Sequence, residues 1–157
     1  MSHVAFIKTP LGIAKIVGDE EGISEISILE EGVVSKTIPK QLKEVVLQLK
    51  DYFSGIRTDF NFKLNPKGTD FQQKVWQELG NIPFGKTISY LDLAKKLGDP
   101  KVIRAAASAN GKNPLWIVVP CHRVIGTDGS LTGYAGGLWR KKWLLEHENP
   151  TNQQSLF

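Results

Sequence analysis

The chain has 157 residues, 41% of them hydrophobic and 23% charged, which fits one compact domain or two small ones. It contains no run of about 18 apolar residues and no signal-peptide layout, so we expect no membrane span and a protein of the cytoplasm. The single cysteine excludes an intramolecular disulfide and a metal site with several cysteine ligands, and the three scattered histidines do not replace one.

The net charge of +4 is unevenly distributed. Residues 1–65 contain 8 basic and 9 acidic side chains, net −1, whereas residues 66–157 contain 12 and 7, net +5. The second part therefore matches what a polyanion such as nucleic acid would bind. A solvated basic surface without a partner is the alternative.

The first 65 residues have the pattern of a small scaffold domain. Residues 4–28 alternate apolar and polar side chains between turn residues, which predicts two or three antiparallel strands. Helical spacing follows over 42–53, and alternation over 60–64 predicts one more strand. Residues 65–68 have the composition of a linker. This region contains no residue pattern that is typical of a catalytic or binding site.

Two helices are predicted next from their capping residues. Thr69 and Gln72 form a capping-box pattern that begins a helix, and Gly80 ends it. Ser89 is placed to cap a second helix, which ends at Gly98. A third helix close behind a glycine turn would complete a helix-turn-helix.

The third predicted helix begins at Asp99-Pro100 and runs to about Gly111. It is rich in small residues, and Arg104 is the long cationic side chain among them. Small residues allow a helix backbone to approach a partner closely, and a protruding arginine fits a groove or a base stack. The alternative is an alanine-rich core helix with Arg104 at its solvent edge.

The segment around Cys121 is the candidate reactive site. Residues 115–119 form a short apolar run that predicts a buried strand, and Pro120 should end it. Cys121 then lies where the chain leaves the core. A thiolate is a strong nucleophile, and neighbouring cationic side chains favour it. An inert buried thiol is the alternative.

His122 follows the cysteine, although adjacent side chains on an extended backbone point to opposite faces. A turn or a bridging water would connect the two. A carboxylate behind the imidazole would fix its tautomer. Glu146 and Glu148, near the end of a helix predicted from Leu138 to about His147, are both candidates, and spacing does not choose between them.

A glycine-rich loop follows the turn at 126–130. Residues 133–137 are small apart from Tyr134, which would stack on a flat ring in a pocket walled by this loop. An ordinary connection to the last helix is the alternative.

These residues together resemble a known family. Pro120-Cys121-His122-Arg123-Val124, with Tyr90, Arg104 and Asn113 before it and Tyr134-Ala135-Gly136-Gly137 after it, is similar to the O6-alkylguanine-DNA alkyltransferases, densely over 69–148. The resemblance implies a ribonuclease-H-like α/β domain, here 1–65, and a mainly helical winged helix-turn-helix domain, here 69–150. Residues 151–157 would form a flexible tail.

The resemblance implies direct reversal of DNA damage by irreversible transfer of an alkyl group, methyl above all, from O6-alkylguanine to Cys121. O4-alkylthymine is a further candidate substrate. His122 would deprotonate the thiol through a water, oriented by Glu148, while Asn113 braces the turn and Tyr90 offers its hydroxyl to the departing guanine. Because the product is a thioether, each molecule would act once, and no cofactor is expected.

The resemblance also implies how DNA is bound. Arg104 would fill the space that the flipped nucleotide leaves. The residues expected to contact double-stranded DNA through the minor groove are Tyr90, Arg104, Ala105, Ser108 and Arg123. Those expected to line the base pocket are Tyr134, Ala135, Gly136 and Gly137. Some members have a hydroxyl where this chain has Ala135. Others bind zinc in the first domain, but this chain lacks the cysteines, so no metal is expected.

Two rival functions and one additional partner stay open. A winged-helix module that recognises DNA with an inert Cys121 is one rival, and a cysteine hydrolase using Cys121 and His122 is the other. The end of the chain, Gln153-Gln154-Ser155-Leu156-Phe157, is similar to the short motif by which bacterial repair proteins bind the replication sliding clamp. The alternative is a frayed terminus. We expect a monomer.

Overall fold

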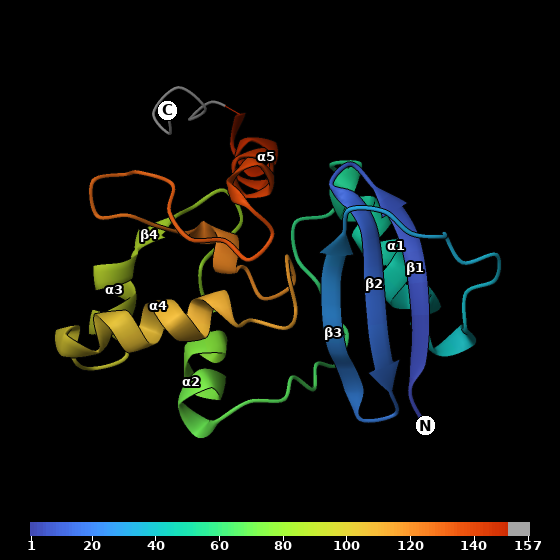
Figure 1. The fold of residues 1–157 in the computed structure, drawn as a ribbon, viewed down its shortest axis with the longest axis horizontal. Coiled ribbons are helices and arrows are strands. Elements are labelled where there is room, and N and C mark those ends of the chain that lie inside the picture. Colours follow the sequence, from blue (N-terminus) through green and yellow to red (C-terminus); the bar gives the residue numbers. More distant parts are fainter. Residues whose placement is uncertain (151–157) are drawn as a thin grey trace. The chain divides into compact units, whose positions relative to one another are not determined.

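The computed structural model describes residues 1–150, so the tail motif lies outside the described residues. The chain divides into two compact units, which are described separately. Unit 1 contains residues 1–67 together with 114–118, and unit 2 contains 68–113 and the chain from 119 onward. The predicted fold class, a small sheet domain followed by a mainly helical one, is confirmed (Figure 1).

Unit 1 is built on an antiparallel sheet of three strands in chain order. The strands are β1 (His3–Thr9), β2 (Gly12–Asp19) and β3 (Gly22–Leu29). Side chains alternate between a buried and a more exposed face along them, as the period-2 pattern predicted. Gly12 and Gly22 begin the second and third strands with positive φ angles, which tight turns between strands favour. Both hairpins were predicted correctly.

A short 3-10 turn, η1 (Lys40–Leu42), leads into α1 (Lys43–Phe53), which packs on the sheet (Figure 1). This helix matches the predicted one, and its buried side chains include Leu49 and Tyr52, both 0% exposed. The predicted strand at 60–64 is wrong, because only Leu64 forms a bridge, to Ile23 of β3. Alternation of side chains alone does not guarantee a partner for the backbone.

Residues 114–118 return to unit 1 and pair with β3, which the sequence did not predict. Leu115 forms a bridge with Ile26, but the predicted strand over 115–119 is wrong. Ile117 has a φ of 75°, and the amide of Val118 donates to the Trp116 carbonyl over 2.8 Å, which defines a γ-turn. The run is buried as predicted, but an apolar run does not distinguish a strand from a buried turn.

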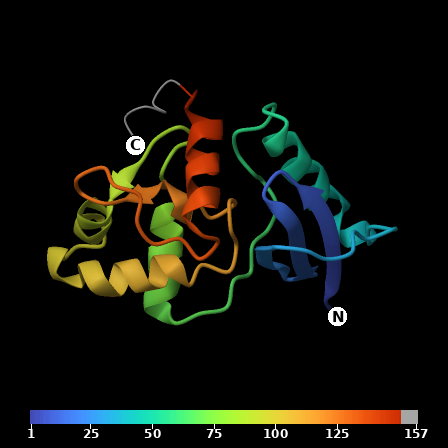
Figure 2. The same ribbon diagram turned by 45° about the horizontal axis from the view of Figure 1, so that its top comes forward.

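Unit 2 contains the three predicted helices, α2 (Asp70–Leu79), α3 (Tyr90–Lys96) and α4 (Ile103–Gly111), the last preceded by η2 (Pro100–Val102). The capping boxes at Thr69 and Ser89 both form, and the Asp99 side chain accepts from the Lys101 amide. In Figure 2, α4 lies against α2, and the Trp76 indole donates to the Ala109 carbonyl over 2.9 Å. Helices α3 and α4 form the helix-turn-helix.

The end of unit 2 holds the reactive segment. It consists of η3 (Cys121–Arg123), β5 (Val124–Ile125) and the last helix, α5 (Leu138–Glu148). Strand β5 pairs in parallel with β4 (Ile88–Ser89), a short ladder that the sequence did not predict. Within residues 1–150, no helix is long and apolar enough to cross a membrane.

Candidate active site

Two tight turns place the Cys121 side chain. The Cys121 amide donates to the Val119 carbonyl over 2.8 Å across Pro120, an inverse γ-turn, and η3 begins at once. Asn113 is 3% exposed and its side-chain amide donates to the same Val119 carbonyl over 2.7 Å. The structure therefore places Asn113 at the turn that presents the thiol. A turn replaces the extended backbone that would separate Cys121 from His122.

The Cys121 thiol is held in its protonated form by its surroundings. Its residue is 3% exposed, and this burial raises the pKa of the thiol to about 11. The hydrogen bond from Asn113 and the positive charge of Lys141 oppose that rise in pKa. Because the thiolate is the nucleophile, the thiol needs a base close by.

His122, the candidate base, belongs to a buried hydrogen-bond network. His122 is 0% exposed, and its Nε2 lies 2.8 Å from Oε2 of Glu148. The Arg123 guanidinium donates to both carboxylate oxygens of Glu148, over 2.8 and 2.9 Å, and to the Ile82 carbonyl over 2.7 Å. Glu148 thus accepts three charge-assisted hydrogen bonds from two neighbouring side chains.

This network determines the tautomer of the imidazole. Burial raises the pKa of Glu148, but the charges and hydrogen bonds of His122 and Arg123 outweigh it and hold that pKa well below its ordinary value. An ionised carboxylate only accepts hydrogen bonds, so His122 donates from Nε2. Its Nδ1 is buried, has no hydrogen-bond partner and is the acceptor atom of the neutral ring. Of the two candidate carboxylates, Glu148 contacts His122, whereas Glu146 lies 4.0 Å from Lys142.

Arg123 does not lie where a DNA contact was expected. The residue is 6% exposed, and its guanidinium is bonded to Glu148 and Ile82 and lies over the Phe84 ring. A guanidinium with these partners is not presented to a phosphate backbone. The sequence placed it beside the thiol but did not reveal its partners.

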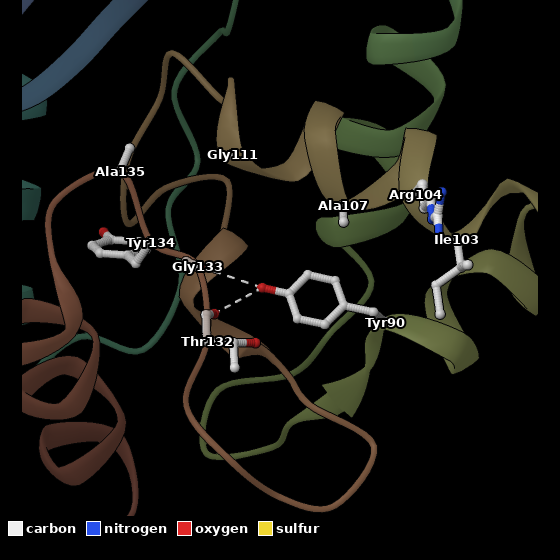
Figure 3. A pocket seen from close by; sticks show the side chains of 9 residues that line it. All are labelled: Tyr90, Ile103, Arg104, Ala107, Gly111, Thr132, Gly133, Tyr134 and Ala135. Carbon is white, nitrogen blue, oxygen red and sulfur yellow. Dashed lines mark hydrogen bonds between the residues drawn. The ribbon is translucent and has the colours of Figure 1, made fainter.

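Unit 2 contains a cavity of about 640 Å³. Figure 3 shows its lining, which is formed by Tyr90, Ile103, Arg104, Ala107, Gly111, Thr132, Gly133, Tyr134 and Ala135. Tyr134 and Ala135 therefore lie where the pocket prediction put them. Gly136 and Gly137 are not in the lining: the Gly136 carbonyl accepts from Arg140 over 2.9 Å, and Gly137 precedes α5 with a φ of 90°.

Tyr90 reaches from α3 to the loop opposite. Its hydroxyl donates to the carbonyls of Thr132 and Gly133, over 2.9 and 3.3 Å (Figure 3). Burial raises the pKa of the Tyr90 hydroxyl and also that of Tyr134, so both stay protonated donors at neutral pH. A thiolate at Cys121 would raise both pKa values further, although Cys121 is not one of the lining residues.

One face of the helix-turn-helix is exposed and basic. Along α4 and the turn before it, the exposed residues recur at helical spacing: Lys101, Arg104, Ala105, Ser108, Gly111 and Lys112. Arg104, Ala105 and Ser108 thus share the exposed face of α4, as a DNA contact would require. Of the predicted contact residues on this helix, only Arg104 also lines the cavity.

Sequence reasoning missed two buried polar residues beside the thiol. Lys141 is 0% exposed on α5, and Asn110 is 2% exposed on α4 with its amide 3.4 Å from the Cys121 carbonyl. The spacing of Lys141 from Leu144, Leu145 and Glu148 places it on the buried face of α5, and this signal was available in the sequence. Nothing comparable identified Asn110.

Among residues 1–150, no group of three or more His, Cys, Asp or Glu side chains is arranged to hold a metal ion. The acidic and imidazole groups of the site are bonded to one another and to Arg123.

Two family models match the chain. The DNA-binding domain of 6-O-methylguanine DNA methyltransferase matches residues 70–150, and the ribonuclease-like domain of the same enzyme matches residues 3–66. Together they cover both halves of the sequence in the order that the fold class predicted.

Relatives and solved structures agree with these models over most of the chain. A methylated-DNA–protein-cysteine methyltransferase of Methanosarcina acetivorans is 42% identical, over 93% of this chain and 97% of that protein. The O6-methylguanine methyltransferase of Mycobacterium tuberculosis has a similar structure, with a TM-score of 0.84, 41% identity, and coverage of 96% and 94%. The structure of the Mycobacterium tuberculosis OGT in complex with DNA has a TM-score of 0.85 and 43% identity, and the match covers 94% of this chain and 93% of that chain. The chain belongs to the methylated-DNA–protein-cysteine methyltransferase family.

Proposed function

We propose that Cys121 is the residue to which this methyltransferase transfers the alkyl group of O6-alkylguanine in DNA, once per molecule. The observation that best supports this role is a buried hydrogen bond. His122, which directly follows the only cysteine of the chain, is paired with Glu148. The pairing leaves Nδ1 of His122 as an acceptor without a partner. A base held in one tautomer beside a nucleophile is the arrangement that covalent catalysis requires.

The transfer is a displacement at carbon. The bond from Cys121 Sγ to the alkyl carbon forms while the bond from that carbon to guanine O6 breaks, and the guanine leaves with the electron pair. The thiol proton moves to Nδ1 of His122 through a bridging water. His122 then releases one proton through solvent and the departing guanine takes one up, so that overall the thiol proton replaces the alkyl group on the base. The Tyr90 hydroxyl donates to the guanine as its negative charge develops. Arg123 acts through Glu148, which it holds in place.

The cavity is the binding place for the extruded base. Tyr134 offers an aromatic face, and Ala135 and the neighbouring backbone complete the wall. The exposed face of α4 enters the minor groove, where its small residues allow close approach and Arg104 occupies the space of the flipped nucleotide. Because damage occurs in any sequence, binding relies mainly on phosphate contacts and weakens with salt.

Stoichiometry tests this proposal against its two rivals. The protein is titrated with a duplex containing O6-methylguanine, and the repaired guanine is counted per protein molecule. One equivalent, with the protein left inactive, is the expected result. Unrepaired DNA that stays bound would favour a recognition module with an inert thiol. Hydrolysis of ester or amide substrates with repeated turnover would favour a cysteine hydrolase.

The role of Arg104 has its own test. We expect Arg104→Ala to slow repair in duplex DNA by about tenfold or more, since flipping a base costs a few kcal/mol and the wedge offsets part of it. Reaction with free O6-benzylguanine should change by less than about twofold, because no stack has to open. Lys101→Ala, on the same exposed face but outside the cavity lining, is the matched control. Equal losses of rate with duplex DNA and with O6-benzylguanine would contradict the proposed role of Arg104 in base flipping.

The C-terminal motif supports a second partner. Glutamines followed by Leu156 and Phe157 suit a sliding clamp, with polar contacts and two apolar anchors. Deletion of residues 153–157 should abolish capture by a bacterial clamp and leave alkyl transfer unchanged. Unchanged capture would show that the clamp does not bind through this motif, and no capture of the full chain would rule the partner out. We further propose a monomer that works in the cytoplasm, where a free thiol stays reduced.

A further inference from the structure

Lys141 places a cation inside unit 2 without a carboxylate beside it. The residue is 0% exposed, and its ammonium donates to the carbonyl of Thr132 over 2.6 Å and to that of Gly133 over 3.4 Å. Among the described residues, no acidic side chain forms an ion pair with it. A buried ammonium is costly unless its hydrogen bonds are made. The neighbouring Lys142 is exposed, so α5 presents one lysine inward and the next to solvent.

The same two carbonyls also accept from Tyr90. Its hydroxyl lies 2.9 Å from the Thr132 carbonyl and 3.3 Å from that of Gly133, and the Lys141 ammonium lies 5.6 Å from the centre of its ring. Each carbonyl oxygen has two lone pairs, so both donors are accommodated at once. The free protein thus has two donors where one would satisfy the loop.

This duplication has a consequence for base entry. A hydroxyl has one proton to donate, so Tyr90 has to release the loop carbonyls before it donates to a guanine. Thr132 and Gly133 are exposed residues, so without a second donor the release would leave their carbonyls to water and would detach the loop from its protein partner. Lys141 has three donor protons and already contacts both carbonyls.

We propose that Lys141 is a positioning residue that keeps the Thr132 and Gly133 carbonyls satisfied, so that the Tyr90 hydroxyl is free to pass from the loop to the departing guanine. The inference rests on the proposed role of Tyr90 as a donor to the guanine. It assigns Lys141, the middle residue of the Arg140-Lys141-Lys142 run, a function that its sequence neighbours do not share.

The electrostatic setting is compatible with this role. Burial lowers the pKa of Lys141 to about 8, so the ammonium form prevails at neutral pH. The titratable groups that interact with it are Cys121 on η3 and Tyr90 on α3, and both are protonated and neutral before reaction. The positive charge also favours the thiolate as it forms.

A double-mutant cycle tests the inference with O6-methylguanine in duplex DNA. We expect Tyr90→Phe to slow single-turnover transfer by about a hundredfold and Lys141→Met by about tenfold. In the Lys141→Met background, Tyr90→Phe should add less than about tenfold, because the hydroxyl is then retained by the loop. Lys141→Arg, which keeps the donors, should recover most of the rate. Lys142→Met is the matched control and should change the rate by less than about twofold.

The outcomes distinguish the proposed donor role of Tyr90 from the inference about Lys141. If Tyr90→Phe reacts at the wild-type rate, the proposed donor role of Tyr90 fails, and the inference fails with it. If Tyr90→Phe is slow but its effect multiplies fully with that of Lys141→Met, only the inference about Lys141 is overturned. Should Lys141→Met not fold, the thermal unfolding of Tyr90→Phe decides. If Lys141 acts as a second donor, the midpoint of thermal unfolding of Tyr90→Phe should lie within about 2 °C of the wild-type value. A decrease of about 6 °C or more would contradict the inference.

Discussion

The two units of this protein bury very different side chains. In unit 1, the buried polar residues of the described chain are Thr9 and Gln48, and the rest of the interior is apolar. Unit 2 buries seven polar or charged residues, namely Asn110, Asn113, His122, Arg123, Arg140, Lys141 and Glu148. Six of these bond to the segment 119–123, to one another, or to the loop beside the cavity.

This difference separates what stabilises the fold from what performs the chemistry. Burial of apolar area stabilises a folded chain in proportion to that area. Burial of an ionisable group is unfavourable unless its partners are in place, and a buried ion pair adds little net stability. We therefore expect unit 1 to act as a scaffold, and we propose that the reaction explains the arrangement of the polar groups buried in unit 2.

The largest expected effect comes from breaking the polar network of unit 2. Glu148→Gln removes the charge that Arg123 and His122 share, and we expect a loss of about 4 kcal/mol in the free energy of unfolding. Alkyl transfer per folded molecule should fall about a hundredfold, because the imidazole loses its orienting partner. Urea unfolding and single-turnover kinetics measure the two effects. Glu146→Gln, two residues earlier on α5, is the control. It should change neither the free energy of unfolding nor the rate of alkyl transfer by much.

The pH dependence of that loss has a definite sign. The pKa of Glu148 in the folded chain lies below its ordinary value of 4.5, so the unfolded chain binds more protons in acid. The wild-type advantage is therefore complete above about pH 5 and shrinks as the pH falls through the range below 4.5. Unfolding curves of wild type and Glu148→Gln should converge in acid. A constant gap between them down to about pH 3 would contradict the ionised carboxylate.

A smaller effect, confined to stability, is expected in unit 1. Leu49 is 0% exposed on α1, and Leu49→Ala should lower the free energy of unfolding by about 3 kcal/mol. The rate of alkyl transfer per folded molecule should stay within about twofold of wild type. Leu47→Ala, at a residue that is 52% exposed on the same helix, is the matched control. A tenfold loss of rate in the folded Leu49 variant would remove the distinction between the units.

The smallest effect is expected at the wall of the cavity. Ala135→Ser adds a hydroxyl that donates to guanine O6 as negative charge develops there, and we expect transfer to become about threefold faster. The second-order rate constant with duplex DNA measures it. Val33→Thr, which adds a hydroxyl at a residue of unit 1 that is 83% exposed, is the control and should leave the rate unchanged. A slower Ala135→Ser would indicate that the wall has no room for the hydroxyl.

Local patterns in the sequence predicted the elements that local interactions determine. The capping residues Thr69, Ser89 and Asp99 gave three helix starts, because each cap depends on a side chain and backbone within three residues. The apolar run 115–119 failed as a strand, since burial of the run is compatible with a γ-turn at Ile117. The strand expected at 60–64 failed because its partner is set by tertiary pairing.

The site was predictable where residues carry their own chemistry and unpredictable where their partners are distant. Cys121 and His122 were identifiable side by side, but the choice of Glu148 depended on a contact across 26 positions. Arg123 was expected on DNA and lies buried on the same carboxylate. Lys141 was missed because three consecutive basic residues look alike in composition, and only their periodicity on α5 distinguishes the inward one.

The central claim is that the alkyl group ends on Cys121. The most direct measurement is a peptide map after reaction with a duplex carrying isotopically labelled O6-methylguanine. We expect the label on the peptide that contains Cys121, at up to one per molecule, and none on the Cys121→Ser variant. Label on another residue, or repaired DNA with an unmodified Cys121, would contradict the account.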